Sequence, residues 1–293
     1  MPQPSRIRLD RLPGLRLHAL LRLALAMACL APAVAEVDRT ALDAIATGAH
    51  RSEGNQARNV YRNPIETLAF FEVAPDMTVV EVWPGRGWYT EVLAPYLRDT
   101  GTLYAAAFTL SASDTLDYRR RIQAAYEAQL KAQPDQYDQV SITELGAPNA
   151  WTAAPAGTAD RVLTFRNVHN WMKGGFDQAM FRAFYAALKP GGVLGVVEHR
   201  ARPGTAKAEM IESGYVTEMY VIELAARAGF ELVGSSEVNA NKADDRDHPE
   251  GVWTLPPALR LGDDQRERYL AIGESDRMTL KFKKPETAAS SSR

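Results

Sequence analysis

The chain has 293 residues, of which 46% are hydrophobic and 24% are charged, and its formal net charge is −2. These fractions are typical of a globular protein and exclude a collagen, a coiled-coil rod and a wholly disordered chain. The near-zero net charge gives no overall attraction to nucleic acid, so no nucleic-acid partner is expected. The single cysteine, Cys29, excludes an intrachain disulfide bond.

Residues 1–35 have the pattern of a secretory signal. Five arginines and one aspartate precede or flank the start of a short apolar run, Leu23–Leu30, and an A-x-A sequence ends at Ala35. This pattern predicts cleavage after Ala35 and export, either to the periplasm or out of the cell. The apolar run is too short to cross a bilayer, so no stable membrane span is expected after cleavage. The polar residues 285–293 are predicted to form a flexible tail.

Short apolar runs alternate with helical stretches through the rest of the chain, which predicts a parallel sheet with crossover helices. The first helix is predicted to have Asn63 as its cap and Pro64 at its first position, and it forms an N-terminal helical extension before the sheet. The seven predicted strands span Thr78–Val82, Leu103–Phe108, Val140–Leu145, Asp160–Phe165, Val193–Glu198, Glu231–Val238 and Arg277–Lys283. The later predicted helices span Trp88–Leu97, Asp114–Lys131, Phe176–Leu188 and Tyr215–Ala228. The long polar stretch Asn239–Arg260 has no predicted element, and such a loop is often a lid or a binding loop.

A glycine-rich turn follows the first predicted strand and precedes a predicted helix. Gly85 and Gly87 let the backbone approach a ligand, and Glu81 can accept hydrogen bonds from a ligand's ammonium or hydroxyl groups. The same residues also suit a strand-to-helix turn that merely needs small residues. A dinucleotide-binding turn would have a small residue in place of Thr90 and an acid at the end of the Leu103–Phe108 strand. A nicotinamide-dependent oxidoreductase is therefore the third-ranked hypothesis.

The segment Leu188–Gly192 (LKPGG), followed by an apolar strand, is found in class I S-adenosylmethionine-dependent methyltransferases. The chain resembles that superfamily over about Asn59–Lys284, and more narrowly it resembles a group of exported, predicted methyltransferases. The stretches that carry the resemblance are Glu81–Leu97, Phe165–Trp171, Leu188–Arg200 and Gly273–Phe282. The resemblance implies one methyltransferase-like domain over residues 36–284. It further implies a Rossmann-like, doubly wound, mostly parallel seven-stranded α/β sheet and S-adenosylmethionine as the cofactor.

The first motif of this superfamily has an acid followed by glycines at alternate positions. Glu81, Gly85 and Gly87 match the motif. Trp83 stands where the first glycine is usual, so its ring must point away from the cofactor or stack on it. The acid that usually holds the ribose hydroxyls after the second strand is also absent. The resemblance and the adjacent aromatic residues imply a cofactor site formed by Glu81, Trp83, Gly85, Gly87, Trp88 and Tyr89.

A polar cluster follows the Asp160–Phe165 strand, whose exit faces the transferred methyl group in this fold. His169 is the predicted general base, because the ordinary pKa of histidine lies near neutrality, and its alternative role is to hydrogen-bond the loop. Arg166 could bind an anionic substrate or form a surface ion pair, and Asn167 could orient the substrate or cap the turn. His199 leaves the next strand at the same edge and is either the alternative base or a polar strand end.

No metal site is predicted, because the acids and the histidine within Asp244–His248 have no recognised ligand spacing. The predicted reaction is methyl transfer from S-adenosylmethionine to an unidentified small molecule. S-adenosylmethionine is made in the cytoplasm, whereas residues 1–35 predict export. A non-catalytic ligand-binding module of the cell envelope is therefore the second hypothesis. A solvent-facing Glu81 and a glycine turn filled by Trp83 would favour this module.

Overall fold

The computed structural model describes residues 36–110 and 117–286. The predicted secretory signal at residues 1–35 lies outside this part, as do residues 287–293 of the predicted tail and the first turn of the helix predicted from Asp114. Within the two described ranges, no helix combines the length and the apolar composition that a membrane span requires.

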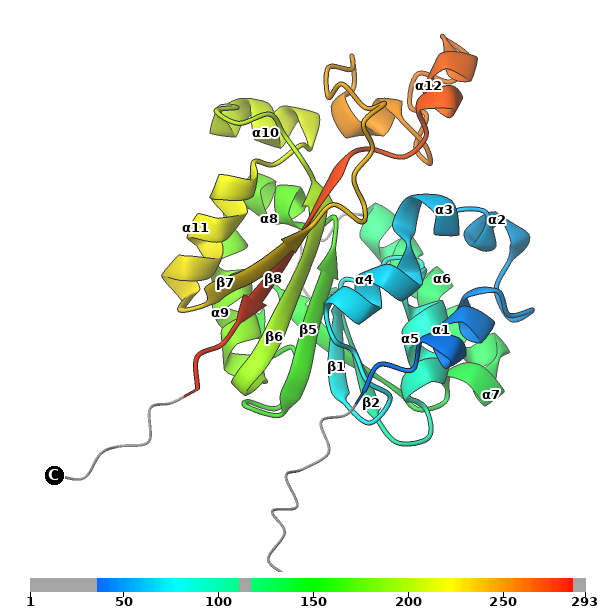
Figure 1. The fold of residues 1–293 in the computed structure, drawn as a ribbon, viewed down its shortest axis with the longest axis vertical. Helices are drawn as coiled ribbons and strands as arrows, with labels where there is room; N and C mark the ends of the chain where they lie inside the picture. The colour runs from blue at the N-terminus through cyan, green and yellow to red at the C-terminus, as the bar shows by residue number, and fades with distance from the viewer. Residues whose placement is uncertain (1–35, 111–116, 287–293) are drawn as a thin grey trace, which may run out of the picture. The chain divides into compact units, whose positions relative to one another are not determined.

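The strands of the described chain form one eight-stranded sheet (Figure 1). They are β1 (Thr78–Val82), β2 (Thr102–Phe108), β3 (Val140–Gly146), β4 (Ala150–Trp151), β5 (Ala159–Phe165), β6 (Leu188–His199), β7 (Glu231–Ser236) and β8 (Arg277–Lys283). Their order is β4-β3-β2-β1-β5-β6-β8-β7. The five strands from β3 to β6 in this order are parallel, whereas β4 runs antiparallel to β3, and β8 runs antiparallel to β6 and β7. The predicted doubly wound, mostly parallel sheet is confirmed, and β4 is added to the seven predicted strands.

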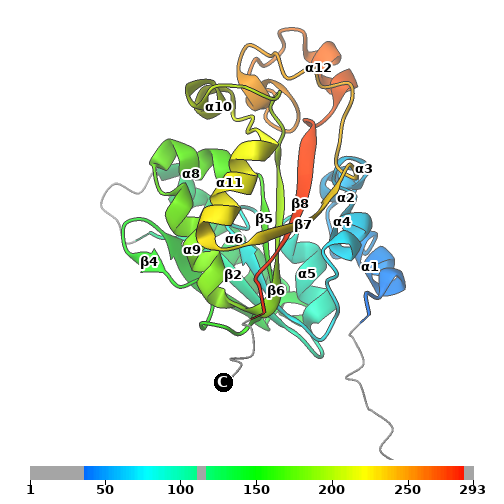
Figure 2. The same cartoon turned by 60° about the vertical axis from the view of Figure 1, so that its left-hand side comes forward.

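Helices cover both faces of this sheet (Figures 1 and 2). The predicted helix of the N-terminal extension is confirmed as α4 (Pro64–Phe70), and the extension also contains three helices that were not predicted, α1 (Arg39–Ala46), α2 (Glu53–Gln56) and α3 (Asn59–Arg62). On the same face lie α5 (Thr90–Leu97), α6 (Asp117–Ala132) and α7 (Pro134–Tyr137). The other face is covered by α8 (Val168–Gly174), α9 (Asp177–Ala187) and α11 (Glu218–Ala228). Beyond the carboxyl ends of the parallel strands lie α10 (Lys207–Ser213), the 3-10 helix η1 (Gly251–Thr254) and α12 (Arg266–Ile272).

Alternate side chains of β1 enter the two apolar layers of the fold. Val80 and Val82 pack in the core that includes residues of α9 and α11, whereas Val79 packs in the core that includes residues of α4 and α5. The same alternation directs Glu81 toward the layer of α5 and α6. Its carboxyl group is therefore buried among side chains from these two helices.

Several predicted helix starts or caps differ from the structure, among them the start of α11, which is at Glu218 and not at Tyr215. The side chain of Asn63 does not cap α4, because Asn63 has a φ of +39° and its Nδ2 donates to Val238 O at 2.7 Å. This hydrogen bond instead joins the N-terminal extension to the segment after β7. The helix predicted from Trp88 begins at Thr90, because the preceding residues form a turn around the glycines.

Candidate functional site

A cavity of about 660 Å³ lies at the carboxyl ends of β1, β5 and β6. The order of the strands reverses between β1 and β5, and ligands of open α/β sheets bind in the crevice outside such a point. The cavity volume is in the range of small-molecule sites. The walls come from the N-terminal extension, the glycine turn, the segment after β5 and residues within 252–258. Residues 252–258 belong to the predicted loop Asn239–Arg260. The centroid of the Trp253 ring lies 5.9 Å from the centroid of the His169 ring.

The fold brings nearly all of the predicted site residues to this cavity. Those that line it are Glu81, Trp83, Gly85, Trp88, Tyr89, Arg166, Asn167, His169 and His199. Gly87 does not line the cavity, and it lies close to α6 instead. A Cβ at Gly87 would meet the Tyr126 ring at 3.0 Å, so this glycine permits close packing of the turn against α6.

Gly85 leaves the main chain of the turn open to the cavity. Its φ of +64° lies in the left-handed region that favours glycine. A Cβ built at Gly85 would meet no atom within 4 Å. A ligand can therefore approach the backbone at Gly85 more closely than a residue with a side chain would allow.

The carboxyl group of Glu81 is buried. Glu81 is 2% exposed, and its Oε2 accepts a hydrogen bond from Thr90 Oγ1 at 2.6 Å. The Tyr126 hydroxyl lies 3.2 Å from the same Thr90 oxygen. Burial raises the pKa of Glu81 to about 7, even though the hydrogen bonds from Thr90 oppose the shift. The solvent-facing Glu81 that would favour a non-catalytic module is therefore not found.

The raised pKa of Glu81 makes stability depend on pH. Because folding raises this pKa from 4.5 to about 7, the folded chain favours the protonated form. Glu81 therefore lowers the free energy of unfolding as pH rises from 4.5 to 7, by about 3 kcal/mol at about 1.36 kcal/mol per pKa unit. We expect Glu81→Gln to raise the free energy of unfolding by about 3 kcal/mol at pH 8 and to change it little at pH 5, as measured by urea unfolding. An equal effect at both pH values would contradict the raised pKa, and the exposed Glu209→Gln on α10 is the control.

The ring of Trp83 points away from the glycine turn. Its Nε1 donates to Leu145 O at 2.8 Å, at the end of β3. Its ring centroid lies 4.8 Å from that of Phe108 at the end of β2 and 5.8 Å from that of Trp171 in α8. Trp83 thus forms a wall of the cavity over the ends of β2 and β3. It does not fill the turn, because the space above Gly85 is open.

Trp88 and Tyr89 join the glycine turn to the N-terminal extension. The guanidinium carbons of Arg51 and Arg62 each lie 4.7 Å from the centroid of the Trp88 ring. The Tyr89 ring stacks on Phe165 with 3.5 Å between centroids, and its hydroxyl donates to Arg62 O at 3.1 Å. Both aromatic side chains therefore have protein partners, and each presents only a small part of its surface to the cavity.

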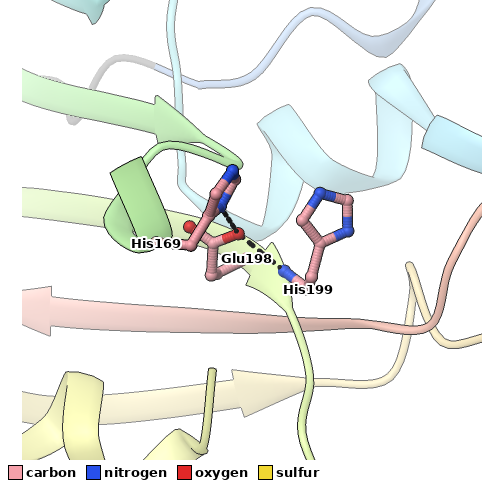
Figure 3. Close-up of side chains that lie close together, drawn as sticks. All are labelled: His169, Glu198 and His199. Atoms are coloured by element: carbon pink, nitrogen blue, oxygen red, sulfur yellow. Dashed lines mark hydrogen bonds and ion pairs between the residues drawn. The ribbon is translucent and has the colours of Figure 1, made fainter. Parts of the chain in front are cut away.

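His169 lines the cavity and forms a hydrogen-bonded pair with the buried Glu198 behind it. Figure 3 shows the Glu198 carboxylate joined to the His169 ring and to the main-chain nitrogen of His199. His169 Nδ1 lies 3.1 Å from Glu198 Oε1, and the carboxylate also accepts from Val168 N at 2.6 Å and from His199 N at 2.9 Å. A carboxylate only accepts hydrogen bonds, so the proton of His169 is on Nδ1 and the lone pair is on Nε2. Asn170 Nδ2 lies 3.0 Å from Nε2 and donates to it. His169 is therefore held in the tautomer and orientation that a general base requires.

The other predicted residues on the acceptor side have different surroundings. His199 Nδ1 is hydrogen-bonded to Ser275 Oγ, and burial, together with the neighbouring histidine and arginines, holds the pKa of His199 well below its ordinary value. Asn167 Nδ2 donates to Val82 O at 3.0 Å and so joins the ends of β5 and β1. Arg166 lies in the cavity wall and, in the described part of the chain, takes part in no ion pair.

Two groups of described residues, one around Glu198 and one around Asp244, place histidine and carboxylate atoms within 4.8 Å of one another. The carboxylate of Glu198 already accepts from three N–H groups. Asp244 accepts from the Tyr215 hydroxyl and from Asp276 N, and His248 Nε2 lies 2.8 Å from it. Both carboxylates thus already accept hydrogen bonds from other groups of the chain. That the protein needs no metal stays a prediction.

Known proteins resemble this chain in structure. No protein-family model and no curated protein matches its sequence. A SAM-dependent methyltransferase from Aquifex aeolicus superposes with a TM-score of 0.51 and 14% identity, over 85% of this chain and 100% of that chain. The [4+2]-cyclase SpnF has a TM-score of 0.53 and 16% identity, over 82% of this chain and 86% of that chain. A putative sarcosine dimethylglycine methyltransferase from Galdieria sulphuraria has a TM-score of 0.51 and 12% identity, over 81% and 91%.

This chain has the class I methyltransferase fold. At such identities the neighbours establish the fold alone, and one of them is named for a cyclase reaction. Compared with the motif expected in a class I methyltransferase fold, this chain has Trp83 in place of a glycine and Thr109 in place of an acid after β2. The reaction must therefore be inferred from the residues of the cavity.

Glu198 was not predicted as a site residue, although its position in the sequence points to the site. Glu198 directly precedes His199 at the end of a predicted strand, and β6 pairs with β5, so its end lies beside the residues that follow β5. Arg58, Arg62 and Glu274 were also missed, and here the sequence offers no local signal, because 216 residues separate Arg58 from its partner Glu274.

Proposed function

We propose that this protein transfers a methyl group from S-adenosylmethionine to a small-molecule acceptor. The observation that carries the proposal is that His169, oriented by Glu198, lines the same cavity as the open turn at Gly85. When bound, S-adenosylmethionine supplies an electrophilic methyl group whose C–S bond breaks as the bond from the acceptor to carbon forms, leaving S-adenosylhomocysteine.

The residues of the cavity fit this cofactor at the glycine turn. The space above Gly85 has room for a ligand against the main chain, and the cavity of about 660 Å³ is large enough for cofactor and acceptor together. Thr109 in place of an acid removes one expected contact to the cofactor, and Glu81 is hydrogen-bonded to Thr90. We therefore expect the main chain around Gly85 to supply much of the binding.

His169 serves as the general base for an oxygen or nitrogen acceptor. The acceptor's O–H or N–H takes the place of Asn170 Nδ2 and donates to His169 Nε2, which receives the proton as the methyl group is transferred. Glu198 stabilises the positive charge that then forms on the imidazole and keeps the ring in position through Nδ1. The proton leaves His169 for solvent after the transfer.

The first test is calorimetric titration of the protein with S-adenosylmethionine and, separately, with S-adenosylhomocysteine. Saturable binding with a micromolar Kd is expected. A folded protein that binds neither compound at millimolar concentration would refute the proposal and leave the ligand-binding module as the better hypothesis. The two structural features that would favour that module, a solvent-facing Glu81 and a filled glycine turn, are both contradicted.

Gly85→Ala should raise the Kd for S-adenosylhomocysteine at least tenfold, as measured by the same titration. The added Cβ enters the space where the ligand lies against the backbone, and each factor of ten corresponds to about 1.4 kcal/mol. Gly157→Ala is the matched control. Gly157 has a φ of +67° and equally open space at its Cβ position, but it precedes β5 at the opposite edge of the sheet. Both variants should lose similar stability through backbone strain, and equal Kd values for the two would contradict a role for Gly85 in binding.

A further inference from the structure

Four arginines gather around one carboxylate beside the cavity. Glu274 Oε1 accepts from Arg58 Nε at 2.6 Å, and Glu274 Oε2 accepts from Arg62 Nε at 3.1 Å and from Arg277 Nη2 at 2.7 Å. Arg166 is the fourth member, close enough for its charge to affect Glu274. We call Arg58, Arg62, Arg166 and Arg277 the arginine cluster. Three of its members and Glu274 line the cavity, whereas Arg277 lies behind them.

Positive charge exceeds negative charge in this cluster. One carboxylate serves three guanidinium groups, and the side chain of Arg166 has no hydrogen bond or ion pair with any residue in the described ranges. Arg62 is 2% exposed, and its Nη2 has no hydrogen-bond partner in the described part of the chain. Arg58 Nη2 is likewise buried without a partner there. Buried N–H groups of a guanidinium that have no acceptor are costly, so the two unpartnered Nη2 atoms and the unpaired Arg166 indicate a missing anionic partner.

The backbone of Arg166 has a strained conformation at the cavity. Arg166 directly follows β5 with a φ of +62°, in the left-handed region that residues with a side chain rarely adopt. Its main-chain N–H donates to Val197 O at 2.7 Å and so keeps the residue in line with β6. Burial lowers the pKa of Arg166 to about 10, with neighbouring arginines adding to the effect and Glu274 opposing it. Arg166 therefore still carries its charge at neutral pH.

We propose that Arg166, together with Arg58 and Arg62, binds a carboxylate or phosphate group of the methyl acceptor, so that the acceptor is an anionic small molecule. Guanidinium groups match the planar, bidentate geometry of such oxyanions. Arg166 and His169 lie in the same segment after β5 and line the same cavity. An acceptor anchored at Arg166 by its anionic group can thus present its nucleophilic atom to His169 Nε2. The identification of the anion with the acceptor rests on the proposed function, whereas the anion site itself does not.

The anion site is tested on the whole protein with inorganic phosphate and with succinate as probes. The unfolding temperature is measured against the concentration of each anion, with sodium chloride at matched ionic strength as the reference. We expect a saturable rise for the wild type and an apparent Kd at least tenfold higher for Arg166→Gln. Arg182→Gln, which removes one exposed arginine from α9, should behave as the wild type and corrects for the general stabilising effect of phosphate. Equal responses of the wild type and Arg166→Gln would overturn the proposal.

A second readout separates binding from a structural role. If Arg166 served only the fold, Arg166→Gln would lower the unfolding temperature in sodium chloride alone. If Arg166 instead serves to bind an anion, removing its charge relieves repulsion within the arginine cluster. Arg166→Gln should then be at least as stable as the wild type in sodium chloride without phosphate. A large loss of stability in sodium chloride would count against the proposal.

A third experiment identifies the source of the anionic group. Kd values are measured for S-adenosylhomocysteine and for 5′-methylthioadenosine, which lacks the amino-acid part and its carboxylate. If the anion belongs to the acceptor, Arg166→Gln leaves both values unchanged, and phosphate still binds when S-adenosylhomocysteine is present. A higher Kd for S-adenosylhomocysteine alone would assign Arg166 to the cofactor and overturn the acceptor assignment. Phosphate binding without any binding of S-adenosylhomocysteine would refute the proposed function and the acceptor assignment while supporting the anion site.

Discussion

Replacing His169 by glutamine should lower kcat for methyl transfer by about 100- to 10 000-fold, with little change in the Kd for S-adenosylhomocysteine. Glutamine can still donate a hydrogen bond to Glu198, so the buried carboxylate keeps a partner. It cannot take a proton from the acceptor, which is the function assigned to Nε2. The kcat is measured from initial rates of S-adenosylhomocysteine release with the first acceptor found among anionic small molecules. The Kd is measured by calorimetry.

His248→Gln is the matched control for His169→Gln. His248 also pairs with a carboxylate, Asp244, but it does not line the cavity. This variant should lower stability and leave kcat unchanged. Glu198→Gln should lower kcat as well, because its amide can donate to Nδ1 and so favours the tautomer whose Nε2 carries a proton. If His169→Gln keeps the wild-type kcat while His199→Gln loses it, His199 is the base instead.

The parallel sheet could be predicted because its strands leave clear local patterns. The run Thr78–Val82 is rich in β-branched residues, and a turn with Pro84 and two glycines follows it. The helices α2 and α3 could not be predicted in this way, because each has four residues and is too short to show a helical period. The strand β4 has only two residues and depends on pairing with β3. Elements that exist through tertiary contacts leave no periodic signal in the sequence.

The candidate site was predictable in its positions and less so in its contacts. The carboxyl ends of parallel strands meet at one edge, so the glycine turn and His169 were expected to lie together. That Thr90 would hold the carboxyl group of Glu81 was not evident, although Thr90 was already noted as a departure from a dinucleotide-binding turn. The direction of the Trp83 ring depends on the acceptor at Leu145 O, which lies 62 residues away in sequence. The position of these side chains in the site could be predicted from the sequence, whereas their hydrogen-bond partners could be identified only in the structure.

Glu274→Gln should lower the free energy of unfolding by about 3 to 5 kcal/mol at neutral pH, because it leaves the buried Arg62 and Arg277 and the half-buried Arg58 without a carboxylate. Burial alone would raise the pKa of Glu274, but the arginine cluster outweighs burial and lowers this pKa from 4.5 to about 2. The stabilisation is therefore fully present above pH 4.5 and is lost as pH falls from 4.5 to 2. Urea unfolding should show the full difference from the wild type at pH 7 and a smaller one at pH 3.

The exposed Glu209→Gln again serves as the control and should change stability little at either pH. A Glu274→Gln effect below about 1 kcal/mol at pH 7 would mean that the ion pairs contribute no more than exposed ones. Glu81→Gln has the opposite predicted sign at pH 8, although both glutamates are at most 3% exposed. Burial alone therefore does not set the sign. The nearby arginines of Glu274 and the neutral hydroxyl partner of Glu81 account for the contrast.

Glu274→Gln also tests the anion site from the opposite direction to Arg166→Gln. Without Glu274, the arginine cluster has lost the carboxylate that three of its members share, so its attraction for an added anion increases. Phosphate should then bind more tightly to Glu274→Gln than to the wild type and should restore part of the lost stability, since a ligand that binds only the folded state raises the free energy of unfolding. Sodium chloride at the same ionic strength should restore much less. If phosphate stabilises the variant and the wild type equally, the bound anion is not held by the arginine cluster, and the acceptor would have to be anchored elsewhere in the cavity.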